Sequence, residues 1–364
     1  LPLLKSRTLF ILKKSNYKVL GVMSGTSLDG LDIVYVKFRL GKEWSFSILA
    51  SQTVSYSTYW EKKLSDLSNS SNEIITKENE LYTSYLAEII LQFVKVNNLF
   101  EIDAVCSHGH TLFHQPEKGY TFQMGNEKKL AEIIGCPVVC DFRVQDVALG
   151  GQGAPLVPVG DLLLFKEYDA CLNLGGFANS SMIEEDNLKA YDICAVNTVL
   201  NILAQKNNLK YDDGGSLAKM GNLIVPLLEK LKSLDFYSKR PPKSLGIEWV
   251  YKEIYPILKQ YEDRKTEDLL NTYTKHIAEQ IGKTFKKNQK VLATGGGVKN
   301  RYLMQLIKEN SFSKFIIPSK EILDFKEALI FGLLGVLRLR GEINCFASVT
   351  GSSKDHSTGV VFQP

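Results

Sequence analysis

The segment 21–34 constrains this chain most, because it crowds glycines, hydroxyls and carboxylates between two strand-like runs. The runs 17–22 and 31–38 are apolar and β-branched, which predicts two strands joined by a tight turn. Glycine lets the backbone approach an anion closely, so this turn can present N–H groups and hydroxyls to a phosphate. No Lys follows the glycines and no helix is expected after them, which excludes a Walker loop and a dinucleotide fingerprint. The alternative is an ordinary hairpin turn of small residues.

Size and charge narrow the class of protein. A chain of 364 residues is long for one core and is expected to form two domains. The net charge of +4 is mild and the densest basic run ends a predicted helix, so we expect no nucleic-acid partner. No apolar run reaches membrane-spanning length, so no membrane partner is expected either. A homodimer is left open.

The six cysteines form no CxxC pair and show no His/Cys metal spacing. Several lie in apolar, strand-like runs, which favours buried free thiols and a reducing, cytoplasmic setting. His108, His110 and His114 could form a metal cluster, but they lie in an expected loop and no nearby Cys completes a zinc set. Ligand contacts or structural roles are therefore favoured for these histidines.

Strand-like runs alternate with helical ones, which predicts an α/β fold. Each half shows a three-strand meander, a helix, a strand, a glycine-bearing loop and a helix, without obvious sequence identity. We therefore expect two α/β domains, residues 1–165 and 166–364, with a helical insertion at about 211–265. Ligands collect beyond the carboxyl ends of strands in such sheets, so one interdomain cleft is expected to hold the site. The expected strands are 17–22, 31–38, 44–56, 103–106, 137–140, 170–174, 180–183, 189–193, 291–294 and 315–317, and the main helices 73–97, 196–205 and 327–339.

Motifs spread over nearly the whole chain beyond residue 17 resemble those of one family. They are residues 23–30, 107–111 with His114 and Pro116, 150–158, 173–179, 295–300 and 327–329. Together and in this order, they resemble the anhydro-N-acetylmuramic acid kinases of the sugar kinase/Hsp70/actin superfamily. The resemblance implies two ribonuclease H-like (actin/hexokinase-type) domains and a kinase that uses ATP and Mg²⁺. Its small-molecule substrate would be 1,6-anhydro-N-acetylmuramic acid from peptidoglycan turnover, opened with water and phosphorylated on O6 to N-acetylmuramic acid 6-phosphate.

The catalytic base follows from the same resemblance. The family carries its catalytic Asp in a Phe-Asp-Thr-Gly-Pro-Gly-Asn type motif, and residues 191–197 here read Tyr-Asp-Ile-Cys-Ala-Val-Asn. Asp192 is therefore expected to take a proton from the attacking water. Asn197 also matches, but the stretch 193–196 departs from the family pattern, so contacts made there by relatives are not expected here. Without the resemblance, Asp192 would be a carboxylate that caps the following helix.

The resemblance also implies nucleotide and sugar contacts. The phosphate turns would supply Gly25, Thr26, Ser27, Leu28, Asp29, Gly30, Leu31, Asp32, Gly175, Gly176 and Asn179, and the adenosine turn Gly295, Gly296 and Gly297. Asp29 would hold Mg²⁺ directly or through water. The sugar would meet His108, His110, Arg143, Gln152, Asn197 and Glu327, with Arg143 on its lactyl carboxylate. The alternatives are tight strand-to-helix turns, a connector at 150–158 and a charge at a helix N-terminus for Glu327.

Two other functions share these features. A kinase for another 1,6-anhydrosugar such as levoglucosan would keep Asp192 and the phosphate turns without lactyl and acetamido contacts. A non-enzymatic actin- or Hsp70-like nucleotide switch would bind ATP without a sugar.

Overall fold

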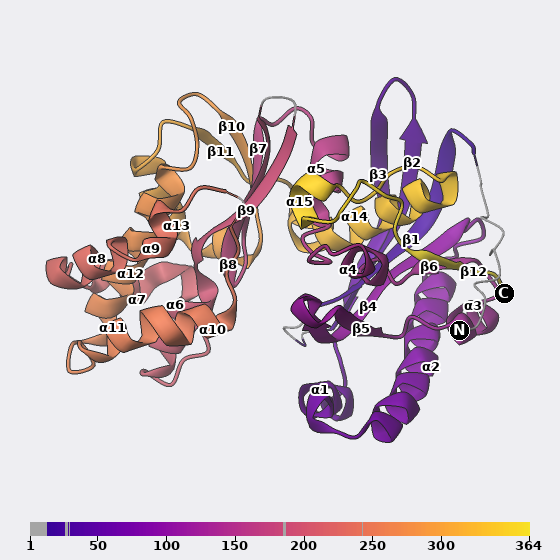
Figure 1. The fold of residues 1–364 in the computed structure, drawn as a ribbon, viewed down its shortest axis with the longest axis horizontal. Coiled ribbons are helices and arrows are strands. Elements are labelled where there is room, and N and C mark those ends of the chain that lie inside the picture. Colours follow the sequence, from indigo (N-terminus) through magenta and orange to yellow (C-terminus); the bar gives the residue numbers. More distant parts are fainter. Residues whose placement is uncertain (1–12, 26–27, 29, 185–186, 242) are drawn as a thin grey trace. The chain divides into compact units, whose positions relative to one another are not determined.

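The computed structural model describes residues 13–364 apart from 26–27, 29, 185–186 and 242 (Figure 1). The chain divides into two compact units, each with its own sheet. Unit 1 is formed by Leu1–Phe165 together with Phe325–Pro364, and unit 2 by Lys166–Asp324. Among the described residues, no helix is long and apolar enough to cross a membrane.

Unit 1 is built on a seven-stranded sheet of order β12-β6-β4-β1-β2-β3, with β5 paired to β4. The first three strands form an antiparallel meander, and β4 and β6 run parallel to β1. The carboxyl ends of β1, β4 and β6 therefore point the same way. The strands are β1 Asn16–Ser24, β2 Leu31–Leu40, β3 Trp44–Val54, β4 Ala104–Gln115, β5 Tyr120–Met124, β6 Val138–Cys140 and β12 Val360–Phe362.

The long helix α2 (Asn72–Val96) shows why its sequence is helical. Ser71 caps it by accepting the N–H of Ile74, and an apolar stripe that includes Tyr82, Leu86 and Phe93 is buried in the core. The predicted helix 73–97 is thus confirmed to within one residue at each end. The other helices of this unit, apart from α14, are α1 Thr58–Asp66, α3 Lys128–Ile134, α4 Val144–Ala148, α5 Val157–Leu164 and α15 Ala347–Thr350.

The closing helix α14 (Lys320–Arg340) packs on the sheet of unit 1. A Cβ atom on Gly21 of β1 would lie 2.0 Å from the carbonyl oxygen of Ala328, and one on Gly335 would lie 2.2 Å from Sγ of Cys106 in β4. Glycine is thus required where helix and strand backbones come closest. This packing, with the pairing of β12 to β6, places residues 325–364 in unit 1, whereas the sequence assigned them to the second domain.

Unit 2 carries a five-stranded sheet of order β11-β10-β7-β8-β9. Strands β7–β9 form an antiparallel meander, β10 is parallel to β7, and β11 is parallel to β10. This repeats the meander-plus-parallel-strand arrangement of unit 1, so the α/β fold with two similar halves is confirmed. The strands are β7 Ala170–Leu174, β8 Phe177–Glu184, β9 Asn187–Ala195, β10 Lys290–Thr294 and β11 Lys314–Ile316.

Helices cover this second sheet and fill the segment 211–265 (Figure 1). The apolar faces of α6 and α12 meet in the core of unit 2 through residues such as Leu200, Leu203 and Tyr273. The helices of unit 2 are α6 Asn197–Gln205, α7 Ser216–Met220, α8 Val225–Lys232, α9 Asp235–Ser238, α10 Ile247–Trp249, α11 Tyr255–Lys259, α12 Thr266–Gly282 and α13 Arg301–Glu309.

One local prediction is wrong. The sequence placed a short strand at 103–106 followed by a loop with the three histidines, whereas β4 continues to Gln115 and pairs with β5. Gly109 has φ +75°, and the pairing of β4 with β1 shifts register at this point. The glycine permits a bulge that a side chain would oppose, because a Cβ there would meet the carbonyl oxygen of Met124 at 2.5 Å.

Candidate active site

In unit 1 several predicted residues lie where β1 and β6 end, beside the part of β4 that goes on to pair with β5. The first feature is a buried hydrogen-bonded chain. Ser24 Oγ lies 2.8 Å from Nδ1 of His110 and 2.7 Å from the hydroxyl of Tyr56, which in turn lies 2.7 Å from the hydroxyl of Tyr82. Burial lowers the pKa of His110 to about 4, so its ring is neutral at pH 7. His110 therefore orients the end of β1, and the hydroxyl of Ser24 faces the protein interior.

His108 and Arg143 form a second connected pair. Nδ1 of His108 lies 2.8 Å from the carbonyl oxygen of Gly109, so Nδ1 carries the hydrogen and Nε2 is an acceptor. Arg143 donates its Nε–H to that Nε2 at 2.8 Å and an Nη1–H to the carbonyl oxygen of Gly153 at 2.6 Å. Burial, with the charge of Arg143, holds the pKa of His108 well below its usual value. A neutral imidazole and a backbone carbonyl thus fix the plane of the guanidinium.

Glu327 lies in α14, and charged groups of both signs act on its carboxyl. Desolvation raises the pKa of its carboxyl, the positive charges of Arg143 and Lys326 oppose this rise, and the Asp32 carboxylate adds to it. The Glu327 side chain also reaches solvent, which weakens each of these effects. The charges of Arg143 and Asp32 thus act on the Glu327 carboxyl, and a ligand site shared by these residues stays a prediction.

Part of the first phosphate turn lies outside the described residues, namely Thr26, Ser27 and Asp29. Leu28 has φ +59° and donates its N–H to the carbonyl oxygen of Gly25 at 3.3 Å. Gly30 has φ +146°, and a Cβ there would lie 2.3 Å from the carbonyl oxygen of Val54. Leu31 begins β2 and is buried in the core. Gly30 is therefore needed for packing against Val54 as well as for any ligand.

In unit 2 the glycine turns follow two neighbouring parallel strands, β7 and β10. A Cβ on Gly295 would lie 2.7 Å from the carbonyl oxygen of Leu174, and one on Gly297 would lie 2.8 Å from Cβ of Leu174. Gly295 also has φ +84°. Nothing lies within 4 Å of the Cβ position of Gly296, so the open side of this turn can receive a flat ligand against the backbone. The turns at 175–176 and 295–297 therefore meet at one edge.

The start of α6 joins the same edge. Asn197 donates its backbone N–H to the carbonyl oxygen of Gly175 at 3.3 Å. A Cβ on Gly176 would lie 2.7 Å from the hydroxyl of Thr198. Asn197, which the sequence predicted to contact the sugar, thus lies beside the turn at 175–176, which the sequence predicted to hold the phosphates.

Asp192 stands in a row of polar residues across the sheet. Asn179 of β8 pairs with Asn173 of β7 on one side and with Asp192 of β9 on the other. Directly paired residues point to the same face of a sheet, so these side chains are neighbours. Desolvation raises the pKa of Asp192, and an N–H from Leu245 to its Oδ2 at 2.7 Å opposes the rise. A half-buried carboxylate with a raised pKa suits a general base better than a simple helix cap.

The structure adds Asp141, which is not among the site residues predicted from the sequence. It directly follows β6, has φ +59°, and desolvation raises its pKa to about 6. A non-glycine residue in the left-handed region at the carboxyl end of a parallel strand marks a functional site more often than chance. The sequence signal was an Asp two residues before Arg143 at the end of a buried strand.

Gln152 is exposed, and its backbone N–H donates to the carbonyl oxygen of Thr350 at 2.8 Å.

A cavity of about 310 Å³ in unit 2 is lined by Tyr191, Lys189 and Arg240 but by no predicted site residue. Tyr191 and Asp192 are successive in β9, so their side chains point to opposite faces of the sheet. The cavity therefore lies away from the face that carries Asp192.

Comparison with known proteins connects these residues to a family. The family model for anhydro-N-acetylmuramic acid kinase matches residues 17–364. The chain belongs to the anhydro-N-acetylmuramic acid kinase family. It is 33% identical to the anhydro-N-acetylmuramic acid kinase of Francisella tularensis subsp. novicida, over 93% of this chain and 97% of the relative. The kinase of the same name from Sulfurimonas denitrificans is also 33% identical, over 94% of this chain and 99% of that protein.

A solved structure with a similar trace is component A of (R)-2-hydroxyglutaryl-CoA dehydratase from Acidaminococcus fermentans. It is 14% identical, with a TM-score of 0.45, over 89% of this chain and 99% of that one. Membership of the anhydro-N-acetylmuramic acid kinase family rests on the sequence matches alone.

Proposed function

We propose that this protein is an ATP-dependent kinase that opens 1,6-anhydro-N-acetylmuramic acid with water and phosphorylates O6, giving N-acetylmuramic acid 6-phosphate for peptidoglycan recycling. The match of the family model over residues 17–364 carries this proposal. Three features of the described residues support it, namely a carboxylate with a raised pKa, glycine turns beside parallel strands, and an arginine held by two hydrogen bonds.

Asp192 is the proposed base. Its carboxylate takes a proton from the water that attacks C1, the bond from C1 to the bridging oxygen breaks, and that oxygen becomes O6. O6 then attacks the γ-phosphate. Desolvation of Asp192 supports this role because it raises the affinity of the carboxylate for the proton. Asn179, its cross-strand neighbour, is proposed to orient the reacting groups.

The glycines at 175–176 and 295–297 are proposed to hold the nucleotide, because their turns adjoin at one sheet edge and Gly296 is open. Mg²⁺ prefers hard oxygen ligands, and the neighbouring carboxylates of Asp32 and Glu327 fit such a cation. Asp29, Thr26 and Ser27 retain their proposed roles at Mg²⁺ and the phosphates. The bound ion would neutralise charge that develops on the γ-phosphate.

Arg143 is proposed to bind the lactyl carboxylate. Its guanidinium is fixed through Nε and Nη1, which leaves Nη2 to donate to an acidic ligand. His110, Gln152 and Asn197 are proposed to complete the sugar contacts, and the helices within 211–265 are proposed as an insertion of the second domain.

Initial rates of ADP release with the muramic anhydrosugar and with levoglucosan test this function. We expect kcat/KM at least about 100-fold higher for the muramic sugar, which corresponds to about 2.7 kcal/mol of transition-state binding. A higher kcat/KM for levoglucosan would mean that the protein is a kinase for that 1,6-anhydrosugar. ATP hydrolysis at a rate that neither sugar changes would favour a nucleotide switch.

A further inference from the structure

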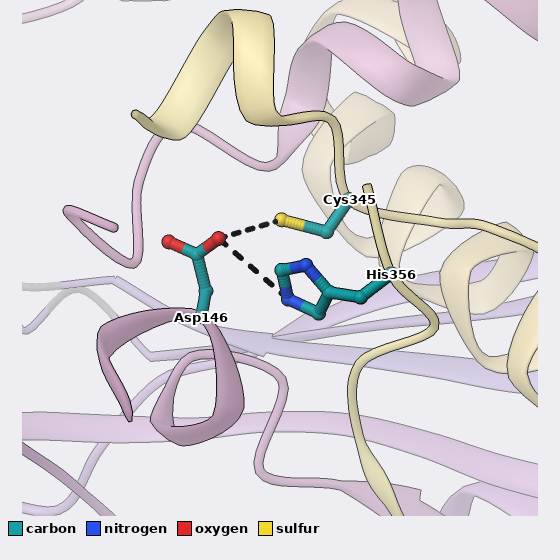
Figure 2. Close-up of side chains that lie close together, drawn as sticks. All are labelled: Asp146, Cys345 and His356. Carbon is teal, nitrogen blue, oxygen red and sulfur yellow. Dashed lines mark hydrogen bonds and ion pairs between the residues drawn. The ribbon is translucent and has the colours of Figure 1, made fainter. Parts of the chain in front are cut away.

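Asp146, Cys345 and His356 form a buried cluster that the proposed reaction does not use. Figure 2 shows Asp146 projecting from α4 toward two side chains on the C-terminal segment. Asp146 and Cys345 are fully buried and His356 is 6% exposed. One ligand atom from each residue lies within 4.8 Å of the others. The cluster joins a carboxylate, a thiol and an imidazole, the three donor types that zinc sites use.

Backbone pairing brings the thiol and the imidazole together. Cys345 and His356 oppose each other in an isolated antiparallel bridge and exchange N–H···O bonds of 3.2 and 3.1 Å. Directly opposed residues carry their side chains on the same face. Cys345 and His356 therefore lie on two backbone segments joined by hydrogen bonds, and Asp146 lies on α4.

The hydrogen bonds of His356 leave one ring nitrogen facing a carboxylate. Nδ1 lies 3.0 Å from the carbonyl oxygen of Lys354, so Nδ1 carries the hydrogen. Nε2 is buried without a hydrogen-bond partner among the described residues, and Asp146 Oδ1 lies 3.6 Å away. The carboxylate cannot donate a hydrogen bond to Nε2, so a cation between the two atoms would give this buried nitrogen a partner.

The spacing suits a metal ion. Asp146 Oδ1 lies 3.2 Å from Sγ of Cys345 and 3.6 Å from Nε2 of His356. The donor atoms of a tetrahedral zinc site lie about 3.3 to 3.5 Å apart, as its metal–ligand bond lengths require. These two distances differ from the zinc values by a few tenths of an ångström, and the ligand atoms of Cys345 and His356 lie within 4.8 Å of each other.

We propose that Asp146, Cys345 and His356 bind one thiophilic divalent metal ion of the zinc type. The Cys345 thiol, which donates to Asp146 Oδ1, loses its proton to solvent when the sulfur–metal bond forms. Although burial raises the pKa of that thiol, direct coordination deprotonates it.

The ion would stabilise residues next to the proposed sugar site, because Asp146 is hydrogen-bonded to the loop that contacts Arg143. Asp146 Oδ2 accepts the N–H of Gly153 at 2.7 Å, and the Gly153 carbonyl accepts from Arg143. Thr350 donates its hydroxyl to Asp146 Oδ1 at 2.7 Å and remains an outer partner of the ligand. A metal here would tie the C-terminal segment to the loop that orients Arg143.

The test uses the full chain without a polyhistidine tag, stripped with a chelator and titrated with Co²⁺ and then Zn²⁺. We expect one Co²⁺ per chain, a thiolate-to-cobalt charge-transfer band, and displacement of the Co²⁺ by Zn²⁺. Cys345→Ser should abolish the band, and His356→Gln should weaken binding at least tenfold. Cys136→Ser, which removes a cysteine outside the cluster, is the matched control and should keep the band.

Wild-type chain that binds no stoichiometric Co²⁺, or a band that persists in Cys345→Ser, would overturn the proposal. If Cys345→Ser fails to fold, Co²⁺ binding by His356→Gln and a zinc-dependent rise in the wild-type melting temperature decide the question, and unweakened binding in His356→Gln would overturn the proposal.

Discussion

Arg143 donates its Nε–H to Nε2 of His108 at 2.8 Å, while the opposite ring nitrogen of His108 is held by the carbonyl of Gly109. A histidine whose pKa lies well below its usual value stays a neutral acceptor across the physiological range. His108 therefore holds the guanidinium of Arg143 in one orientation, and this hydrogen bond does not change with pH near neutrality. A positioned arginine can bind a carboxylate through two parallel hydrogen bonds, which a lysine cannot do.

Arg143→Lys tests that role. The three donors of an ammonium lie on one nitrogen and cannot reproduce the planar spread of the guanidinium toward His108, Gly153 and a ligand. We therefore expect KM for the muramic anhydrosugar to rise at least about tenfold, or about 1.4 kcal/mol. KM for ATP should change by less than about twofold. Arg39→Lys, at an exposed position of β2, is the control and should leave both constants unaltered. An unchanged KM for the sugar in Arg143→Lys would remove Arg143 from substrate binding.

Asp192→Asn should abolish sugar-dependent ADP release, lowering kcat by about 10² to 10⁴-fold, because the amide cannot accept the proton of water. ATP binding, measured by calorimetry, should stay close to that of the wild type. Asp263→Asn, on the exposed surface of unit 2, should behave like the wild type. Turnover near the wild-type rate in Asp192→Asn would refute the assignment of the base.

The pH profile gives an independent test of Asp192. The base works when deprotonated, so kcat/KM should fall as the pH drops through its pKa. Desolvation raises that pKa above 3.8, so the acid limb should lie at a higher pH than for an ordinary Asp. In Asp192→Asn, any residual rate should lack this limb. An identical limb in the variant would assign the titration to another group, with Asp141, whose pKa is raised to about 6, as the first candidate.

The sequence predicted features that depend on local pattern. The strand 170–174 has its expected bounds because a short apolar run lies between a charged segment and two glycines. The meander-and-parallel-strand order of both sheets also follows from the order of such runs. The adjacency of Asn179 and Asp192, in contrast, depends on strand register, which no local pattern specifies.

Contacts between distant segments were not predictable. Helix α14 is apolar on nearly every side of its second half, so its sequence did not indicate which sheet it covers. Cys345 and His356 meet through one β-bridge, and Asp146 reaches them from 199 residues away in sequence from Cys345, so no motif spacing revealed the cluster. The hairpin of β4 and β5 was missed because histidines and glycine interrupt the alternation expected of a strand.

Buried histidines should make this protein sensitive to acid. His110 has a pKa of about 4 in the folded chain and about 6.5 when unfolded, so below pH 6.5 only the unfolded chain gains the proton. The contribution of neutral His110 to the free energy of unfolding is complete above pH 6.5 and is lost as the pH falls toward 4. Between pH 7 and 5 the loss is about 2 kcal/mol. His110→Gln does not titrate, so denaturant unfolding should show a pH dependence smaller by that amount.

His114→Gln is the matched control, because His114 is exposed and its titration should change the pH dependence far less. Equal slopes for the wild type and His110→Gln between pH 7 and 5 would contradict the neutral, buried state of His110. The measurement can be followed through tryptophan fluorescence, since Trp60 packs on Tyr82 in the same core.

Two glycines of α14 should respond in opposite ways to the same substitution. Alanine at Gly335 would place Cβ 2.2 Å from Sγ and 2.7 Å from Cβ of Cys106, so strand or helix must move, at a cost of about 1 to 3 kcal/mol. At Gly332 the nearest atom, on Phe38, lies at an ordinary 3.4 Å, so alanine should stabilise the helix by up to about 1 kcal/mol. Urea unfolding of both variants measures the difference.

Cys106→Ala should recover part of the stability lost in Gly335→Ala, because it removes the atom closest to the new Cβ. A double-mutant cycle should give a coupling energy of at least about 0.5 kcal/mol between the two positions. Equal effects at both glycines would mean that α14 does not contact β4 at Cys106.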